Sequence, residues 1–270
     1  MKVTIVVDNI EHAGIPGEWG FCAYIEQNGK KLLLDTGASN LFADNAEKLN
    51  IDLKDVDFAV LSHAHYDHAN GMEKFFEINE KAPFYLQEGC GENCYFKKGF
   101  VRKYIGIPKG ITKRYQDRIK YVSGICPIAE GIYLVPHSTP HLEQIGKKEM
   151  MYQKTKLGWK PDNFCHEQSL VLDTDSGLVI FNSCSHGGVV NIIHEVKAAF
   201  PDQKITAFIG GFHIFNHPEA AIRELAKLIK ETGIQRIYTG HCSKERGYRI
   251  LREELGDMAG QFYVGMELEF

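Results

Sequence analysis

The chain has 270 residues, a mass of 30.5 kDa and a formal net charge of −4, so it is long enough to bury a substantial core. Hydrophobic residues make up 44% and charged residues 24%, which excludes a disordered or fibrous protein. The acidic balance argues against nucleic acid as a partner, and no apolar run approaches the roughly 20 residues that span a bilayer. The seven cysteines have no paired spacing, which predicts reduced thiols and a cytoplasmic protein.

The first 80 residues alternate between strand and helix patterns. The first apolar run stops at Asp8 and is too short for the core of a signal peptide, so we expect it to form a strand. The spacing of apolar residues over 39–50 predicts a helix with Ser39 as its N-cap. Short β-rich runs between Gly, Pro and Asn residues predict strands, and a second helix is expected over 72–78. These strands span 4–7, 22–25, 31–34, 56–61 and 83–86.

The range from about 88 to 165 has frequent glycines, many aromatic residues and weak strand patterns apart from 132–135. We expect a single domain over 1–270 with this range as a cap or insertion, because no Pro- or Ser-rich linker bounds it. Its aromatic side chains would line a ring-binding pocket or form a small satellite core. Its basic residues favour an anionic substrate, with solvated surface lysines as the alternative. These basic residues are Lys97, Lys98, Arg102, Lys103, Lys109, Lys113 and Arg114.

The last hundred residues return to a regular alternation. The clearest helix is expected over 218–232, where Pro218 lies near the start and Gly233 ends the pattern. The other elements expected here are strands at 169–172, 178–181, 205–209, 236–238 and 262–270, and helices over 189–200 and 243–255. Hairpins and strand–helix alternation in both halves predict an α/β protein with mixed sheets flanked by helices.

The strongest functional signal is a cluster of three histidines and one aspartate within six residues, directly after a buried-strand pattern. The cluster consists of His63, His65, Asp67 and His68. Imidazole and carboxylate side chains together suit divalent metals such as zinc, and neither core packing nor a solvated loop explains their density. One tetrahedral ion would not readily take four ligands from so short a loop. Two ions about 3.5–4 Å apart could take two ligands each, so the motif predicts a dinuclear site.

Three further histidines lie near the ends of predicted strands in the second half, namely His186, His213 and His241. Because the ends of neighbouring strands converge on one rim of a sheet, we expect these side chains to lie close together. His166 precedes a predicted strand and is either a further ligand or part of a polar turn. His137 and His141 are expected in a solvated loop of the cap, with the mouth of the site as the alternative.

The motif resembles the metallo-β-lactamase superfamily, together with the upstream Leu32-Leu-Leu-Asp35-Thr-Gly37 and the late Gly240-His241. The resemblance covers nearly the whole chain and implies an αβ/βα sandwich of two mixed sheets, with a dinuclear metal site at one edge. It also implies that Asp35 orients the loop, since metal-bound imidazoles usually donate their other N–H to a carboxylate or carbonyl. The ligands it implies are His63, His65, Asp67, His68 and His241.

The chain departs from this family at one strand end. The family usually has a histidine and then a bridging aspartate in a Gly-Asp pair, whereas this chain reads Ser183-Cys-Ser-His186. We expect His186 to supply the missing ligand, with Cys184 as a thiolate alternative or a small buried residue. This form and Gly211-Phe-His213 are similar to dihydropterin–ribofuranosylaminobenzene-phosphate synthases. On that resemblance His213 lies at the metals or contacts substrate, with a structural role as the alternative.

The expected chemistry is attack on an ester, phosphoester, thioester or lactam by hydroxide, because two divalent ions lower the pKa of water toward about 7. Asp67 and His213 are the expected catalytic residues, with Asp67 orienting the nucleophile. The ions are expected to be zinc, with manganese or iron as alternatives. We therefore predict a metal-dependent hydrolase of a small anionic molecule, without nucleic-acid or membrane partners. The alternatives are a synthase for pterin-like and phosphoribosyl substrates and a metal-binding module without catalysis.

A competing motif is the aspartic-protease signature Asp35-Thr-Gly37, with Asp175-Ser-Gly177 as a second copy. Such an enzyme needs two carboxylates that share a proton between two lobes. The chain is short for that architecture, a helix pattern follows the first triplet, and the second triplet lies in a tight hairpin. The histidine cluster would also have no role, so we reject this interpretation.

Overall fold

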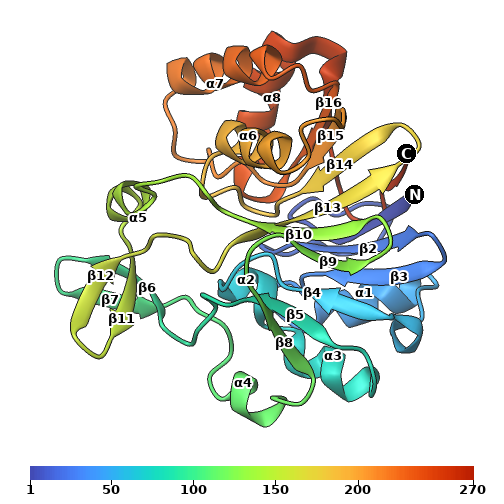
Figure 1. Ribbon diagram of the computed structural model, residues 1–270, viewed down its shortest axis with the longest axis vertical. Helices are drawn as coiled ribbons and strands as arrows, with labels where there is room; N and C mark the ends of the chain where they lie inside the picture. The colour runs from blue at the N-terminus through green and yellow to red at the C-terminus, as the bar shows by residue number, and fades with distance from the viewer.

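The computed structural model describes all residues from 1 to 270. It contains two seven-stranded sheets and one four-stranded sheet. The two large sheets pack face to face in the middle of the molecule, with helices on the outer side of each, and the small sheet stands to one side (Figure 1). The predicted αβ/βα sandwich of mixed sheets is therefore confirmed.

The first large sheet has the order β18-β1-β2-β3-β4-β5-β8. Pairing is antiparallel from β18 to β3 and parallel from β3 to β8. Its strands are β1 (Lys2–Val7), β2 (Cys22–Gln27), β3 (Lys30–Leu34), β4 (Phe58–Val60), β5 (Phe84–Gln87), β8 (Ile119–Val122) and β18 (Glu267–Glu269). The helices between these strands are α1 (Leu41–Lys48), η1 (Leu53–Asp55), α2 (Tyr66–Ala69), α3 (Met72–Ile78) and α4 (Ile111–Arg114).

The second large sheet has the order β17-β16-β15-β14-β13-β10-β9 and mirrors this arrangement. Pairing is parallel from β17 to β14 and antiparallel from β14 to β9. Its strands are β9 (Cys126–Ala129), β10 (Ile132–Pro136), β13 (Gln168–Thr174), β14 (Gly177–Phe181), β15 (Ile205–Ile209), β16 (Arg236–Thr239) and β17 (Ala259–Gln261). The helices of this half are α6 (Val189–Ala199), α7 (Glu219–Glu231), η2 (His241–Ser243), α8 (Lys244–Leu255) and η3 (Gly256–Met258).

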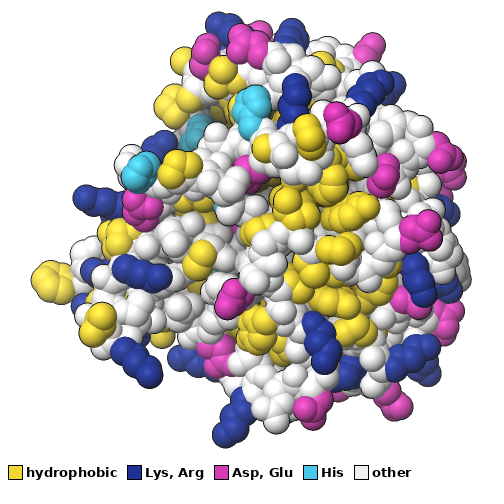
Figure 2. All heavy atoms as spheres, in the orientation of Figure 1, with side chains coloured by type: hydrophobic (Ala, Val, Ile, Leu, Met, Phe, Trp, Pro, Cys, Tyr) yellow, Lys and Arg dark blue, Asp and Glu magenta, His cyan; other side chains and the backbone are white.

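The range 88–165, where the sequence predicts a cap, contributes to all three sheets. Strands β8 and β9 are edge strands of the two large sheets, β10 lies next to β9, and the other strands of this range form the small sheet β12-β11-β6-β7. The small sheet consists of β6 (Cys94–Lys98), β7 (Val101–Tyr104), β11 (Met151–Thr155) and β12 (Gly158–Pro161), with α5 (Glu143–Lys148) beside it. Figure 2 shows Lys and Arg side chains spread around this small sheet.

Alternation along the strands divides the core into three layers. In β3, Leu32 and Leu34 point into the cluster between the two large sheets, whereas Leu33 belongs to the cluster under α1 and α3. In β14, Val179 and Phe181 share the central cluster, while neighbouring residues face α6, α7 and α8. Because both faces of these strands are buried, their sequences read as continuous apolar runs. None of the helices is both long and apolar enough to span a bilayer.

Two predicted elements differ in their bounds. Helix α1 begins at Leu41, and the Ser39 hydroxyl accepts the backbone N–H of Leu41 at 3.1 Å from just outside the helix. The expected strand over 262–270 is only β18, and the preceding strand β17 lies in the other sheet. The segment between them crosses from one sheet to the other, with Gly265 at φ +83°, a conformation that ends a strand and that Gly adopts without strain.

Candidate metal centre

The predicted ligands lie in loops that follow strands at one edge of the two large sheets. The motif loop follows β4, while His186, His213 and His241 follow β14, β15 and β16. Phe181 pairs with Ile209, which pairs with Tyr238, so the last three loops begin side by side. The structure brings every predicted metal ligand to one buried cluster. Their hydrogen bonds show which of the ring nitrogens are free to bind a metal.

One histidine set consists of His63, His65 and His186, whose candidate ligand atoms lie within 4.8 Å of one another. The Nε2 atoms of His63 and His65 and both ring nitrogens of His186 are buried without a hydrogen-bond partner. A buried polar atom left unpaired costs about 1–3 kcal/mol. Burial and the neighbouring His166 imidazole lower the pKa of His65 to about 3, so its ring is neutral at physiological pH. Neutral imidazoles that converge without partners provide the lone pairs a divalent cation binds.

A second set consists of Asp67, His68 and His241. The Nε2 atoms of the two histidines lie 3.2 Å apart, and Asp67 Oδ2 lies 3.5 Å from His241 Nε2. Burial alone would raise the pKa of Asp67, but the His68 and His241 imidazoles lower it below its usual value. Asp67 is therefore a carboxylate that faces two imidazole nitrogens. We refer to these groups as the first and the second histidine set.

Asp35 fixes which ring nitrogens of the motif carry protons. Its carboxylate accepts the Ser62 backbone N–H and hydroxyl, both at 2.7 Å, and the Nδ1–H of His68 at 2.8 Å. Because the Ser62 hydroxyl donates to Asp35, it accepts the Nδ1–H of His63 at 2.9 Å. Both histidines are thereby protonated at Nδ1, and their Nε2 lone pairs point into the cluster. This is the orienting role that the sequence resemblance implied for Asp35.

Two residues that the sequence analysis missed hold the loop of His241. The His241 backbone N–H donates to Asp8 Oδ1 at 2.7 Å, and the Asn9 side chain donates to the His241 carbonyl at 2.8 Å. His241 itself has a φ of +45°, a strained conformation. At Gly240 a Cβ atom would lie 2.4 Å from the Phe262 ring, so only Gly fits there. The sequence signal for these two residues was their position, because Asp8 and Asn9 are polar and directly follow the first apolar strand.

His213, Cys184 and Cys242 lie beside the two sets. Both ring nitrogens of His213 are buried without a partner, and its ring centroid lies 4.3 Å from that of His186. The Cys184 sulfur lies 3.3 Å from His68 Nε2, and the Cys242 sulfur accepts the His213 backbone N–H at 3.2 Å. Like His241, His213 has a positive φ, of +50°. Cys242 was missed, although it directly follows a predicted ligand.

His166 lies next to the first histidine set, with its ring centroid 5.3 Å from that of His65. Both of its ring nitrogens already have partners. Nδ1 accepts the Ala64 backbone N–H at 3.2 Å, and Nε2 donates to Asp162 at 3.1 Å. Of the two roles that the sequence left open, the hydrogen bonds favour a structural one.

The prediction that His137 lies in a solvated loop is wrong, because its side chain is only 6% exposed. Its Nε2 lies 2.8 Å from Glu167 and its Nδ1 lies 2.9 Å from Glu195. The two carboxylates compensate its burial, and the pKa of His137 is raised to about 10. His141 is exposed, as predicted.

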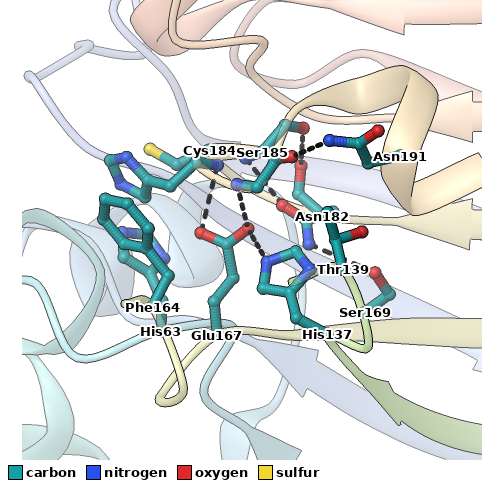
Figure 3. Close-up of polar contacts among 12 residues, drawn as sticks. His63, His137, Thr139, Phe164, Glu167, Ser169, Asn182, Cys184, Ser185 and Asn191 are labelled. Atoms are coloured by element: carbon teal, nitrogen blue, oxygen red, sulfur yellow. Dashed lines mark hydrogen bonds and ion pairs between the residues drawn. The ribbon is translucent and has the colours of Figure 1, made fainter. Parts of the chain in front are cut away.

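Glu167 connects His137 to the loop that follows β14. Its carboxylate accepts the His186 backbone N–H at 3.2 Å and that of Gly187 at 3.4 Å (Figure 3). In the same view the Cys184 sulfur points away from Glu167 and His137, toward the side where His63 and Phe164 lie. Glu167 therefore holds one side of the loop that follows β14, and Cys184 lies on the opposite side, which faces the histidine sets.

A cavity of about 320 Å³ lies beside the cluster, between the loops that carry the histidine sets and the small sheet. Its walls are mostly apolar or aromatic and include Trp19, Tyr66, Phe96, Met151 and Phe215, and His65, Asp67, Cys184, His186 and His213 also line it. Two cations lie over its aromatic rings. Lys103 Nζ is 5.8 Å from the Tyr66 centroid, and Lys244 Nζ is 5.3 Å from that of Trp19. This arrangement suits a small molecule with a flat or apolar body and a negative charge.

Residues 19–148 match the metallo-beta-lactamase superfamily. This match covers somewhat less than half of the chain. The chain is also 27% identical over 265 residues to 7,8-dihydropterin-6-methyl-4-(beta-D-ribofuranosyl)-aminobenzene-5'-phosphate synthase of Methanocaldococcus jannaschii, covering 93% of this chain and 88% of the relative. This confirms the predicted resemblance to both the superfamily and such synthases.

Solved structures with the metallo-beta-lactamase fold superpose on the whole chain. Tm1679, a metal-dependent hydrolase of the beta-lactamase superfamily, has a TM-score of 0.86 and 26% identity, with 100% of this chain and 99% of the other covered. A diphosphatase from the PhnP family has a TM-score of 0.58 and 13% identity, with 100% and 97% covered, and shows a likeness of fold alone.

Proposed function

We propose that the protein is a metal-dependent hydrolase that cleaves an ester or phosphoester-like bond in a small anionic molecule. The observation that carries this proposal is the convergence of buried imidazole nitrogens that have no hydrogen-bond partner. A fold hosts many activities, so the activity has to be argued from the site. The likeness to a metal-dependent hydrolase over the whole chain supports the same conclusion.

The donor atoms fit two divalent cations. His63, His65 and His186 would hold one ion, and Asp67, His68 and His241 would hold the other. Neutral imidazole with a carboxylate suits zinc best among common metals, with manganese or iron as alternatives. Two such ions would lower the pKa of water toward about 7 and polarise the bond under attack.

The chain's own residues would position the reactants. The Asp67 carboxylate is ionised and lines the cavity, so it would orient the attacking water as well as bind metal. His213 lines the same cavity with both ring nitrogens free, which suits hydrogen bonding to a bound substrate. Lys103 and Lys244 would attract the negative charge of the substrate, while Trp19 and Phe215 would contact its body.

A synthase acting on pterin-like and phosphoribosyl substrates is the second candidate. The named relative in Methanocaldococcus jannaschii favours it. So does a second cavity of about 410 Å³, which shares His186 and His213 with the first and is bounded by α5 and α7. A condensing enzyme must hold two substrates at once, and two adjoining cavities suit that requirement.

A substrate panel separates these functions. The protein would be loaded with zinc, manganese or iron(II) and tested on matched anionic and neutral esters and phosphodiesters, each with and without chelator. We expect chelator-sensitive turnover of single substrates, faster for the anionic set. Turnover only with two substrates would favour the synthase, and metal binding without any turnover would indicate a binding module. Because all seven cysteines are free thiols, we also propose that the enzyme acts in the reducing cytoplasm.

A further inference from the structure

Cys184 lies where the two histidine sets meet. Its sulfur is within 4.8 Å of candidate ligand atoms in three separate groups: with His63 and His68, with His186 and His213, and with His241 and Cys242. These groups include members of both sets. The side chain is only 3% exposed, and its sulfur is 3.3 Å from His68 Nε2.

The charge of the centre calls for a second anion beside Asp67. Two divalent cations in a buried cluster bring four positive charges, and burying charge without compensation is costly. Other nearby carboxylates are engaged elsewhere. Asp35 accepts hydrogen bonds from Ser62 and His68, and Glu167 accepts them from His137 and the backbone. A thiolate at Cys184 would supply the missing negative charge from within the cluster.

Cys242 has a different environment, although it also lies in the centre. Its sulfur accepts the backbone N–H of His213 at 3.2 Å, so one of its lone pairs is already used. It belongs to the group with Cys184 and His241, whereas Cys184 also joins the groups of His63 and His186. Cys242 therefore holds the loop of His213, and it provides a matched control for Cys184.

We propose that Cys184 is a metal ligand, bound as a thiolate that the two ions share. This inference rests on the proposed function for the presence of two ions. The S–H bond breaks as sulfur binds, and its proton leaves to solvent. The thiolate takes the place that a bridging aspartate would fill. Because sulfur is a softer ligand than a carboxylate oxygen, the centre would prefer zinc or iron to manganese.

Cobalt(II) tests this ligand directly, because thiolate binding to cobalt gives a charge-transfer absorption in the near ultraviolet that histidine and aspartate do not give. We expect the metal-exchanged protein to show this band, C184S to lose it, and C242S to retain it. In the zinc-loaded wild type, X-ray absorption should show sulfur at about 2.3 Å from the metal. This second measurement needs no variant, so it stands even if C184S does not fold.

The outcomes separate this inference from the proposed function. Wild-type protein that binds cobalt or zinc without any sulfur signal would overturn the role of Cys184 and leave the histidine centre intact. A band that persists in C184S but disappears in C242S would show that Cys242 is the thiolate ligand and would overturn the role of Cys184. Protein that binds neither metal would overturn both proposals. In a competition between zinc and manganese, C184D should shift occupancy toward manganese, and unchanged occupancy would contradict the shared thiolate.

Discussion

Two groups of buried histidines and carboxylates lie close together in this protein, and they differ in one respect. At His137, both ring nitrogens have carboxylate partners, Glu167 and Glu195. In the candidate metal centre, Nε2 of His63 and both ring nitrogens of His186 have no partner. Residue type and burial are the same in both places. The difference shows that residue type and burial alone do not indicate a ligand site, and that buried ring nitrogens without a partner are the additional signal.

The largest expected effect is on metal affinity, which a substitution in the candidate metal centre should lower and a substitution at His137 should not. H65A should lower metal affinity by more than about 100-fold, the upper end for residues that only support a ligand, and abolish activity with it. H137A should retain its metal, because His137 has no free ring nitrogen to offer. Calorimetric titration and elemental analysis measure both. Full metal occupancy in H65A would contradict the ligand assignment.

H137A, which should keep its metal, should instead lose stability. H137A leaves Glu167 and Glu195 buried without a counter-charge, so we expect the free energy of unfolding to fall by about 3–5 kcal/mol. Urea unfolding of the metal-free proteins measures this loss. H141A is the control, because His141 is 73% exposed and should change stability by less than about 0.5 kcal/mol. Equal effects of H137A and H141A would remove the structural role of His137.

A smaller effect on metal affinity is expected from Asp35, which orients candidate ligands but does not belong to either histidine set. In D35N, an amide N–H₂ group would replace an oxygen that accepts from Ser62 or His68. We expect metal affinity to fall by about 10–100-fold, without loss of the fold. S62A removes one donor to Asp35 and the acceptor of the His63 Nδ1–H, but it keeps the carboxylate and its contact with His68, so its effect should be smaller. A larger effect of S62A than of D35N would contradict the role given to Asp35.

The smallest expected effect is the pH dependence of the His137 group. Its pKa is raised to about 10 in the folded state from an ordinary 6.5, so its stabilising contribution is complete below about pH 6.5 and is lost as the pH rises toward 10. Hydrogen bonds from His137 lower the pKa of Glu167 and Glu195 against the effect of burial, so their contribution is lost in acid. The stability difference between wild type and H137A should therefore be largest near pH 5–6 and shrink by pH 10. A difference that is constant with pH would refute this ion-pair group.

The strands of the two large sheets were predictable because they are buried on both faces, whereas their arrangement as a sandwich was implied by the family resemblance. Runs such as Leu32–Leu34 and Leu178–Phe181 divide their side chains between two core layers and therefore read as unbroken apolar segments. The small sheet could not be recognised in this way. Its hairpin tips carry Phe100 and Leu157, both fully exposed, and its strands are only partly buried. Without a buried face, neither alternation nor a continuous apolar run marks a strand.

The centre was predictable where its residues cluster along the chain or end a strand. The motif from His63 to His68 satisfies the first condition, and His241 the second. Glu167 satisfies neither condition, and Asp8 ends a strand but is a single carboxylate, which is too common to indicate a role. Their roles arise from contacts with residues far along the chain, His241 for Asp8 and His137 for Glu167. Such contacts exist only once the sheets have packed.

The cavity takes its walls from two sources. Every candidate ligand comes from loops of the two large sheets, whereas Phe96, Lys103 and Met151 come from the small sheet. The hairpins of the small sheet could therefore differ between relatives without any change in the loops that carry the candidate ligands. Substrate specificity could then change through the small sheet, while the residues proposed to break the bond stay the same.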